Sequence, residues 1–432
     1  DIGFHKQSLL CISYTMKNFI NRFIKHPLFS GSLIMVGGNM AVNVINYGYH
    51  LIMGRVLGPV DYGVLASIYS ILYLVSVIPS SASVAIVKFI SSAKNEGEVY
   101  SIYKSLSVFV LYLAIFMSVA LFIFSPLIAD FLHIDNLWTV SLVSLVLFFS
   151  LITLVNQATS QGLLKFIGSV GPNFISAILK LILGIVLIWL GWSVFGAMVG
   201  IVVGAVVSYF YSLRFVKKIL KESKFKKFIL KPFFAYAFPV LVSALAFTSL
   251  FTSDVILVKH FFSPFEAGIY AALSTLGKII FFAAAPITAT MFPIVSGRKA
   301  RGEAHQKVFL ASLGLTVLMA AVITGFYWLF PNIAIGVLYG SAYLSARSEL
   351  VWMGFFILFY TLSNLLVNYF LSLEKTNIVI FPIVAAVIQV LVILNFHESI
   401  LQVIQISLGL STTLFLFLVF YLSYNRLSKK YA

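Results

Sequence analysis

The chain has 432 residues, of which 61% are hydrophobic and only 10% are charged, and its mean hydropathy is +1.05. Soluble domains carry about 25% charged residues, so this composition excludes a soluble globular protein. The formal net charge is +16, which raises nucleic acid as a partner, but the placement of the charges argues against it. The first residue is Asp1 rather than Met, so we expect the natural chain to start earlier.

The elements begin with an N-terminal segment, 8–25, whose apolar residues share one helical face. This pattern predicts an interfacial helix, with a frayed tail as the alternative. Cys11 in this segment is the one cysteine and cannot form an internal disulfide.

Twelve apolar stretches follow, each near the roughly 20 residues that a membrane-spanning helix needs. We expect these spans near 29–53, 62–90, 105–127, 138–160, 166–190, 194–216, 234–257, 265–293, 308–330, 349–372, 376–396 and 399–423.

Lys and Arg are distributed unevenly between the connections on the two sides of the membrane. With the N-terminus inside, the outside loops hold only Arg55, Lys259 and Arg347, whereas most of the 29 basic residues lie inside. By the positive-inside rule, both termini are cytoplasmic. The basic loops are therefore expected to set the topology and to contact anionic lipid rather than nucleic acid.

A sequence motif occurs twice. Residues 51–66 match residues 256–271 without a gap, and the match pairs Pro59 with Pro264, Asp61 with Glu266 and Gly63 with Gly268. Residues 126–129 match 331–334 at the same spacing. The two acids, Asp61 and Glu266, stand where a carboxylate caps a helix N-terminus, so we favour a structural role for them.

The repeat predicts two copies of one unit. Each half has an even number of spans, so the two copies are parallel rather than inverted. We expect an all-α polytopic membrane protein with two six-helix lobes around a central cavity. The expected parts are an N-terminal segment 1–28, a first lobe 29–216, a basic linker 217–233, a second lobe 234–423 and a tail 424–432.

Three segments resemble a known family. Residues 54–71, GRVLGPVDYGVLASIYSI, resemble the start of the polysaccharide biosynthesis (oligosaccharide flippase) family, and residues 253–278 look like its second-lobe signature. LYGSAYLSA at 338–346 resembles the family's outward connection between the ninth and tenth spans. The resemblance covers nearly the whole chain. It implies the multidrug/oligosaccharidyl-lipid/polysaccharide (MOP) exporter superfamily, with its MATE-like fold of two lobes around a cavity.

The resemblance implies a flippase that carries a polyprenyl-diphosphate-linked oligosaccharide across the cytoplasmic membrane by alternating access, for cell-surface polysaccharide synthesis. Its expected partners are this lipid-linked substrate, membrane lipids, glycan-assembly proteins and Na⁺ or H⁺ as a coupling ion, and it is expected to act as a monomer. A multidrug antiporter and a lipid II flippase of the same superfamily remain alternatives. An enzyme is not expected, because the outward loops are short and carry no catalytic constellation. Direct ATP hydrolysis is not expected, since Gly277-Lys278 lacks the rest of a phosphate-binding loop, and no cofactor is expected.

A flippase for such a substrate needs cations for the diphosphate. Charges at membrane depth are costly, so they usually face a cavity or a partner. Lys278 and Lys180 are the leading candidates for diphosphate contacts; pairing of Lys278 with Asp254 is the alternative. Lys88 could contact the phosphates or simply extend to the interface. Arg55 could be a cavity charge, an outward gate or an interface anchor. Asp254 could bind the coupling ion or neutralise a lysine. Three lysines against one aspartate favour an anionic substrate over an organic cation.

Polar residues of the first span form a stripe. Asn39, Asn43, Asn46 and His50 share one helical face, because their spacings are four, three and four. We expect this stripe to line the cavity and to hydrogen-bond sugar hydroxyls, with helix–helix hydrogen bonds as the alternative. Asn364 and Asn368 form a shorter stripe with the same two interpretations. His50 has no second ligand at suitable spacing, so no metal site is expected.

Overall fold

The computed structural model describes residues 27–217, 219 and 231–431. The predicted interfacial segment 8–25, Cys11 and most of the basic linker lie outside these residues. Within the described part, every regular element is a helix, so the all-α prediction is confirmed. The helices fall into two groups, which we describe in chain order.

The first helix, α2 (Pro27–Ser91), contains two spans rather than one. A straight helix of its 65 residues would be about 98 Å long, whereas a bilayer core is about 30 Å thick. The chain reverses at Gly58, which has φ 72° and ψ 175°. Only glycine adopts such a conformation readily, and the fixed φ of Pro59 suits the start of the second segment.

The remaining helices of the first lobe follow with short connections. A second reversal lies at Gly191, which has φ 89° and separates two adjacent spans. The elements are α3 (Glu96–Ile123), α4 (Ser125–Phe131), α5 (Leu137–Gly162), α6 (Phe166–Leu187), the π-helical turn η1 (Ile188–Trp192) and α7 (Ser193–Val216).

The second lobe begins with two long helices, α8 (Lys231–Phe261) and α9 (Pro264–Ala300). The short helix α11 corresponds to α4 of the first lobe, and the matched prolines Pro126 and Pro331 lie in the first turns of these two helices. The other elements are α10 (Gln306–Leu329), α11 (Pro331–Leu338), η3 (Ser341–Ala346), α12 (Leu350–Ser372), η4 (Thr376–Val379), α13 (Ile380–Asn395) and α14 (Ile400–Tyr431).

The two matched acids have different local roles. Glu266 completes a capping box at the start of α9, in which the Ser263 side chain accepts from the Glu266 backbone N–H and the Glu266 carboxylate accepts from the Ser263 backbone N–H. Its predicted capping role is therefore confirmed. Asp61 instead accepts a hydrogen bond from the hydroxyl of Ser193. This bond ties the second segment of α2 to the start of α7.

Ten stretches of the described chain are long and apolar enough to cross a membrane. Two of them, Ile34–Ser91 and Phe166–Val216, each contain one of the reversals above, so the ten stretches supply the twelve predicted spans. Large apolar side chains are exposed along these helices; Trp189 is 78% exposed and Trp328 70%. The chain is thus a multi-pass membrane protein.

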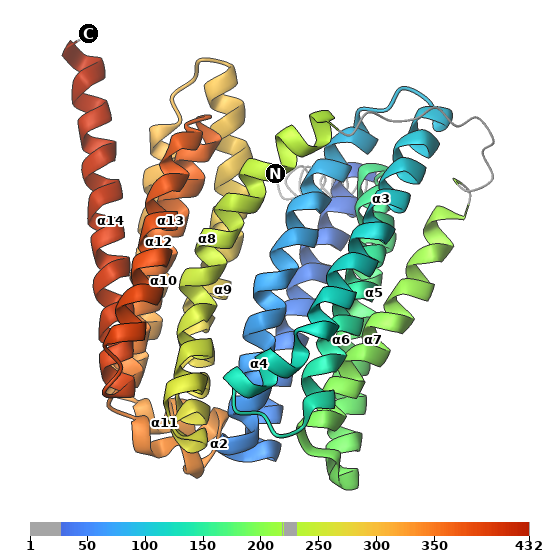
Figure 1. The fold of residues 1–432 in the computed structure, drawn as a ribbon. Coiled ribbons are helices and arrows are strands. Elements are labelled where there is room, and N and C mark those ends of the chain that lie inside the picture. Colours follow the sequence, from blue (N-terminus) through green and yellow to red (C-terminus); the bar gives the residue numbers. More distant parts are fainter. Residues whose placement is uncertain (1–26, 218, 220–230, 432) are drawn as a thin grey trace, which may run out of the picture.

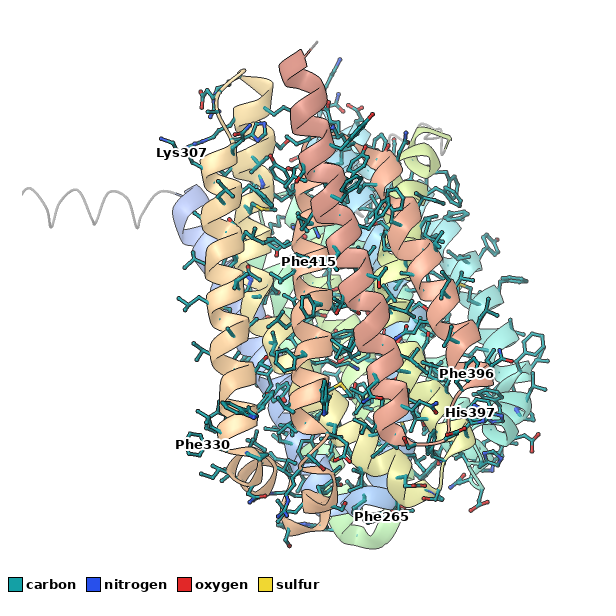
Figure 2. All side chains as sticks on the ribbon, turned by 90° about the vertical axis from the view of Figure 1, so that its left-hand side faces the viewer. Phe265, Lys307, Phe330, Phe396, His397 and Phe415 are labelled. Atoms are coloured by element: carbon teal, nitrogen blue, oxygen red, sulfur yellow. The ribbon has the colours of Figure 1, made fainter. Side chains whose placement is uncertain are left out.

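The two lobes stand side by side (Figure 1), with α2–α7 in blue to green and α8–α14 in yellow to red. The first lobe meets the second through α2, which packs against α8 and α9. Figure 2 shows Lys307 at one end of α10 and Phe330 at the other, with Phe265 and Phe396 at the same end as Phe330. We call the Lys307 end, which sequence analysis predicts to be cytoplasmic, the basic end, and the Phe330 end the closed end.

Candidate functional site

Four tyrosines join the lobes toward the closed end. The hydroxyl of Tyr62 lies 2.9 Å from the Tyr339 hydroxyl and 3.0 Å from the Thr275 hydroxyl. Tyr47 donates to the Thr275 carbonyl at 2.9 Å, and Tyr343 donates to the Gly54 carbonyl at 2.7 Å. Every one of these bonds connects α2 with the second lobe. We call Tyr47, Tyr62, Tyr339 and Tyr343 the tyrosine seal.

Arg55 adds to this closure. Its guanidinium is exposed and donates to the carbonyls of Gly336 and Val337 at 3.0 and 2.6 Å. These carbonyls belong to the end of α11, where the helix dipole favours a cation. The contacts favour the gate interpretation of Arg55, and its contact with a phosphate remains a prediction.

Residues of α4 and α8 make a further contact between the lobes. The His260 ring stacks on the Phe131 ring at 4.0 Å, with an interplanar angle of 4°. The His260 Nδ1 atom also lies 2.6 Å from the Phe131 carbonyl oxygen. The closed end is therefore held by hydrogen bonds and by ring packing from both lobes.

Lys180, in α6, is buried among neutral groups. Its ammonium donates to the Tyr69 hydroxyl at 3.2 Å and lies 4.7 Å from the centre of the Tyr49 ring. Within the described chain it has no ion pair to a carboxylate. Its positive charge is therefore stabilised by a hydroxyl and by aromatic faces, which leaves it able to bind an anion.

Lys278, in α9, is equally buried but has a different environment. Its ammonium lies 4.5 Å from the centre of the Phe251 ring, and it interacts electrostatically with Asp254 without forming a direct ion pair. Asp254 is fully buried and accepts from the Tyr270 hydroxyl at 2.6 Å and from the Val255 N–H at 2.9 Å. The charge of Lys278 is partly balanced, whereas that of Lys180 is not.

His50 connects these two lysines. Its ring packs against Tyr69 at 4.5 Å and against Tyr49 at 5.7 Å, and it is 8% exposed. Lys180 and Lys278 are both close enough to act on this ring electrostatically. A lysine from each lobe thus converges on one histidine. We call His50, Lys180, Lys278, Tyr49 and Tyr69 the cationic cluster.

A pocket of about 420 Å³ lies between α9 and α12. Phe281, Thr288, Phe292, Thr361, Asn364 and Asn368 are among its lining residues. Phe281 is one helical turn beyond Lys278 and packs at 5.2 Å on Phe251, the ring that Lys278 covers. The pocket therefore adjoins the cationic cluster on the side of the second lobe.

The predicted stripe of Asn364 and Asn368 thus lines a pocket. Asn368 Nδ2 also donates to the side-chain oxygen of Asn364 at 3.1 Å. Both amides retain acceptor and donor capacity for a ligand. Their role in binding sugars stays a prediction, because no ligand is present.

The predicted stripe of the first span lies elsewhere. Asn39 and Asn43 are exposed, Asn46 is half-buried, and none of the three donates to or accepts from another described side chain. On the same segment Val42 packs toward α6 and Tyr47 reaches α9. The stripe lies between these two contact faces of the helix. It does not line the pocket of the second lobe.

Lys88 is not part of the cationic cluster. It is exposed and lies in the last turn of α2, at the basic end. This position suits a first contact with a headgroup or an anchor at the membrane surface. Its predicted contact with the diphosphate remains a prediction.

Sequence reasoning missed the tyrosines of the seal and of the cationic cluster. A signal existed, since Tyr62, Tyr69 and Tyr73 recur at spacings of seven and four and so share one face of α2. A polar tip on each ring requires a partner when the ring is buried. The periodicity indicates which residues share a face of α2, but not which other helix packs against that face.

Solved structures with the same architecture are transporters. An inward-facing multidrug resistance MATE family transporter of the MOP superfamily aligns with a TM-score of 0.68 and 14% identity over 89% of this chain and 95% of that chain. Lipid II flippase MurJ, in an inward closed conformation, aligns with a TM-score of 0.72 and 15% identity over 90% of this chain and 87% of that chain. A MOP superfamily transporter from Pyrococcus furiosus, described as having a binding pocket of reverse polarity, aligns with a TM-score of 0.59 and 14% identity. The alignment covers 91% of this chain and 94% of that chain. The fold is that of the MOP superfamily transporters.

The family follows from the sequence itself. The model of the family described as polysaccharide biosynthesis protein matches residues 28–298. The chain therefore belongs to the polysaccharide biosynthesis protein family, as the motifs at 54–71 and 253–278 indicate. No curated protein sequence matches the chain.

Proposed function

We propose that this protein is a flippase of the cytoplasmic membrane. It moves an oligosaccharide linked to a polyprenyl carrier through a diphosphate from the inner to the outer leaflet, for cell-surface polysaccharide synthesis. The observation that carries the proposal is that a lysine from each lobe, Lys180 and Lys278, is buried near the lobe interface, Lys180 against the Tyr69 ring on which His50 packs and Lys278 over the Phe251 ring. Membership in the polysaccharide biosynthesis protein family supports it.

The chemistry of the cationic cluster fits a diphosphate. Lysine is an effective point charge for phosphate groups, and a charge interaction strengthens where water is excluded. Lys180 meets no carboxylate among the described side chains, so an incoming anion does not have to displace one. An organic cation, the substrate of the multidrug alternative, would be repelled by two buried ammonium groups.

The sugars require hydrogen-bonding groups beside the phosphate site. Asn364, Asn368 and Thr288 supply donors and acceptors in the pocket next to Lys278. Asn39 and Asn43 offer further amides without partners among the described side chains. In this proposal these residues contact hydroxyls of the glycan, and Lys88 meets the headgroup at the basic end.

Transport proceeds by alternating access, in which opening of the tyrosine seal follows closure of the basic end. The bonds of Asp254 to Tyr270 and Val255 favour its structural role, so we assign no coupling ion to it. The carrier works as a monomer with membrane lipids around it and makes no covalent change in its substrate.

The test is translocation in proteoliposomes that contain the full chain. A fluorescent polyprenyl-diphosphate disaccharide is placed in the inner leaflet, and its arrival outside is followed with a membrane-impermeant quencher. Faster arrival than in protein-free liposomes is the expected result. Two outcomes contradict the proposal: efflux of organic cations without lipid translocation, and translocation of lipid II in place of the disaccharide lipid.

A further inference from the structure

The His50 ring has an unusual environment for a buried imidazole. Its side chain is only 8% exposed, and its buried Nδ1 atom has no hydrogen-bond partner among the residues that the structure describes. Buried polar atoms are nearly always paired, and an unpaired one costs about 1–3 kcal/mol. An unpaired nitrogen beside two lysines is therefore a place where a ligand is expected.

The groups around the ring are few and mostly positive or neutral. Lys180 of α6 and Lys278 of α9 act on His50, and Asp254 of α8 acts on Lys278. The aromatic neighbours all come from α2 itself: Tyr49, Tyr62 and Tyr69.

We propose that His50 binds a proton together with the substrate anion, so that anion binding and protonation are coupled in the cationic cluster. A third positive charge is unfavourable beside Lys180 and Lys278 when the cluster is empty, because like charges repel in a poorly solvated site. A bound anion with two negative charges attracts the protonated ring, and this attraction offsets the repulsion from the two lysines. The protonated ring then presents an N–H donor to an anion oxygen, which pairs the otherwise unsatisfied nitrogen.

This inference rests on the proposed function, since it assumes that the cationic cluster binds an anion. It adds the coupling partner, a proton taken from the solution at the open side. Among the side chains of the cluster, histidine is the one whose ordinary pKa, near about 6.5, lies closest to neutral pH. The consequence is that anions bind more tightly as the pH falls.

The experiment measures sulfate and inorganic diphosphate binding to the purified full chain by calorimetry, between about pH 8 and about pH 6. Sulfate is included because its own charge is constant in this range. Buffers of different ionisation enthalpy report the protons taken up per anion. We expect sulfate affinity to rise by up to about tenfold per pH unit, with proton uptake in the wild type.

His50→Gln is expected to remove both the pH dependence and the proton uptake, and His397→Gln, outside the cationic cluster, is expected to keep both. Equal pH dependence in wild type and His50→Gln overturns the inference. So does wild-type binding without proton uptake, a result that does not depend on the variant folding and leaves the proposed function standing. Absence of anion binding at every pH overturns the proposed function as well.

Discussion

Gly63 and Gly268, which hold equivalent positions in the two repeats, face each other across the lobe interface. A methyl group on Gly63 would lie 2.8 Å from the backbone nitrogen of Gly268, and one on Gly268 would overlap the carbonyl oxygen of Pro59. Only glycine permits this backbone approach. The duplicated motif thus packs against its own copy, beside the tyrosine seal.

Gly268→Ala should therefore loosen the closed end. The added methyl overlaps backbone atoms, which cannot turn away as a side chain can, so the lobes must separate locally. The measurement is labelling of a buried reporter, Ser67→Cys in a Cys11→Ser background, by an impermeant maleimide applied at the closed end. Ser67 is fully buried one turn beyond Gly63, and we expect its labelling to accelerate.

Gly314→Ala is the matched control, because a methyl at Gly314 meets no atom of the described residues within 4 Å. It should leave the labelling rate unchanged. Equal labelling in Gly268→Ala and Gly314→Ala would show that the glycine contact does not hold the closed end.

Tyr62→Phe tests the hydrogen bonds of the seal without changing its packing. The variant loses the bonds to Tyr339 and Thr275, which together stabilise the closed end by about 1–3 kcal/mol. Labelling of the same reporter should rise roughly five- to thirtyfold if about 1–2 kcal/mol is lost. Tyr112→Phe, at a side chain 69% exposed, should have no effect, and a similar response from both variants would contradict the assignment.

The two buried lysines should differ in their contribution to stability. Lys278→Met leaves Asp254 without its nearby positive charge, so the melting temperature should fall. Adding Asp254→Asn should recover part of that loss, with a coupling energy of about 0.5–3 kcal/mol. Lys180→Met removes a buried charge that faces no carboxylate of the described chain, so it should leave the melting temperature unchanged or raise it. A larger fall in melting temperature for Lys180→Met than for Lys278→Met would contradict this prediction.

Asn156 should act on stability rather than on transport. Its side chain accepts from Tyr103 at 2.8 Å and donates to Ser212 at 2.9 Å, and it is buried inside the first lobe. Asn156→Ala should lower the free energy of unfolding by about 1–3 kcal/mol, because it removes two buried hydrogen bonds, although the Ser212 hydroxyl keeps its bond to the Tyr209 carbonyl. Gln161→Ala, half-buried in the same helix, serves as the control. A selective loss of transport at normal stability would instead place Asn156 in the substrate path.

The sequence predicts most of the fold because its signals are local. A run of apolar residues defines a span wherever it packs, and the matches around Pro59 and Pro264 reveal the two copies directly. The exact reversals at Gly58 and Gly191 agree with the gaps between the predicted spans. The capping role of Glu266 was also predictable, since a capping box involves only neighbouring residues.

The site was predictable only in part, because it depends on how the helices are rotated against one another. Lys180 and Lys278 are separated by nearly a hundred positions, and no periodicity within either span indicates that both approach His50. His50 was predicted as one member of an asparagine stripe, whereas it lies among tyrosines. The bonds of Arg55 to α11 likewise depend on contact between the lobes.

The measurement that tests the central claim most directly is translocation of the fluorescent polyprenyl-diphosphate disaccharide by Lys180→Ala, compared with Lys307→Ala and the wild type. Lys180 belongs to the cationic cluster, whereas Lys307 is an exposed lysine of the basic end. The account predicts that Lys180→Ala loses most of the translocation while Lys307→Ala keeps it. Full translocation by folded Lys180→Ala would contradict an anion path through the cationic cluster.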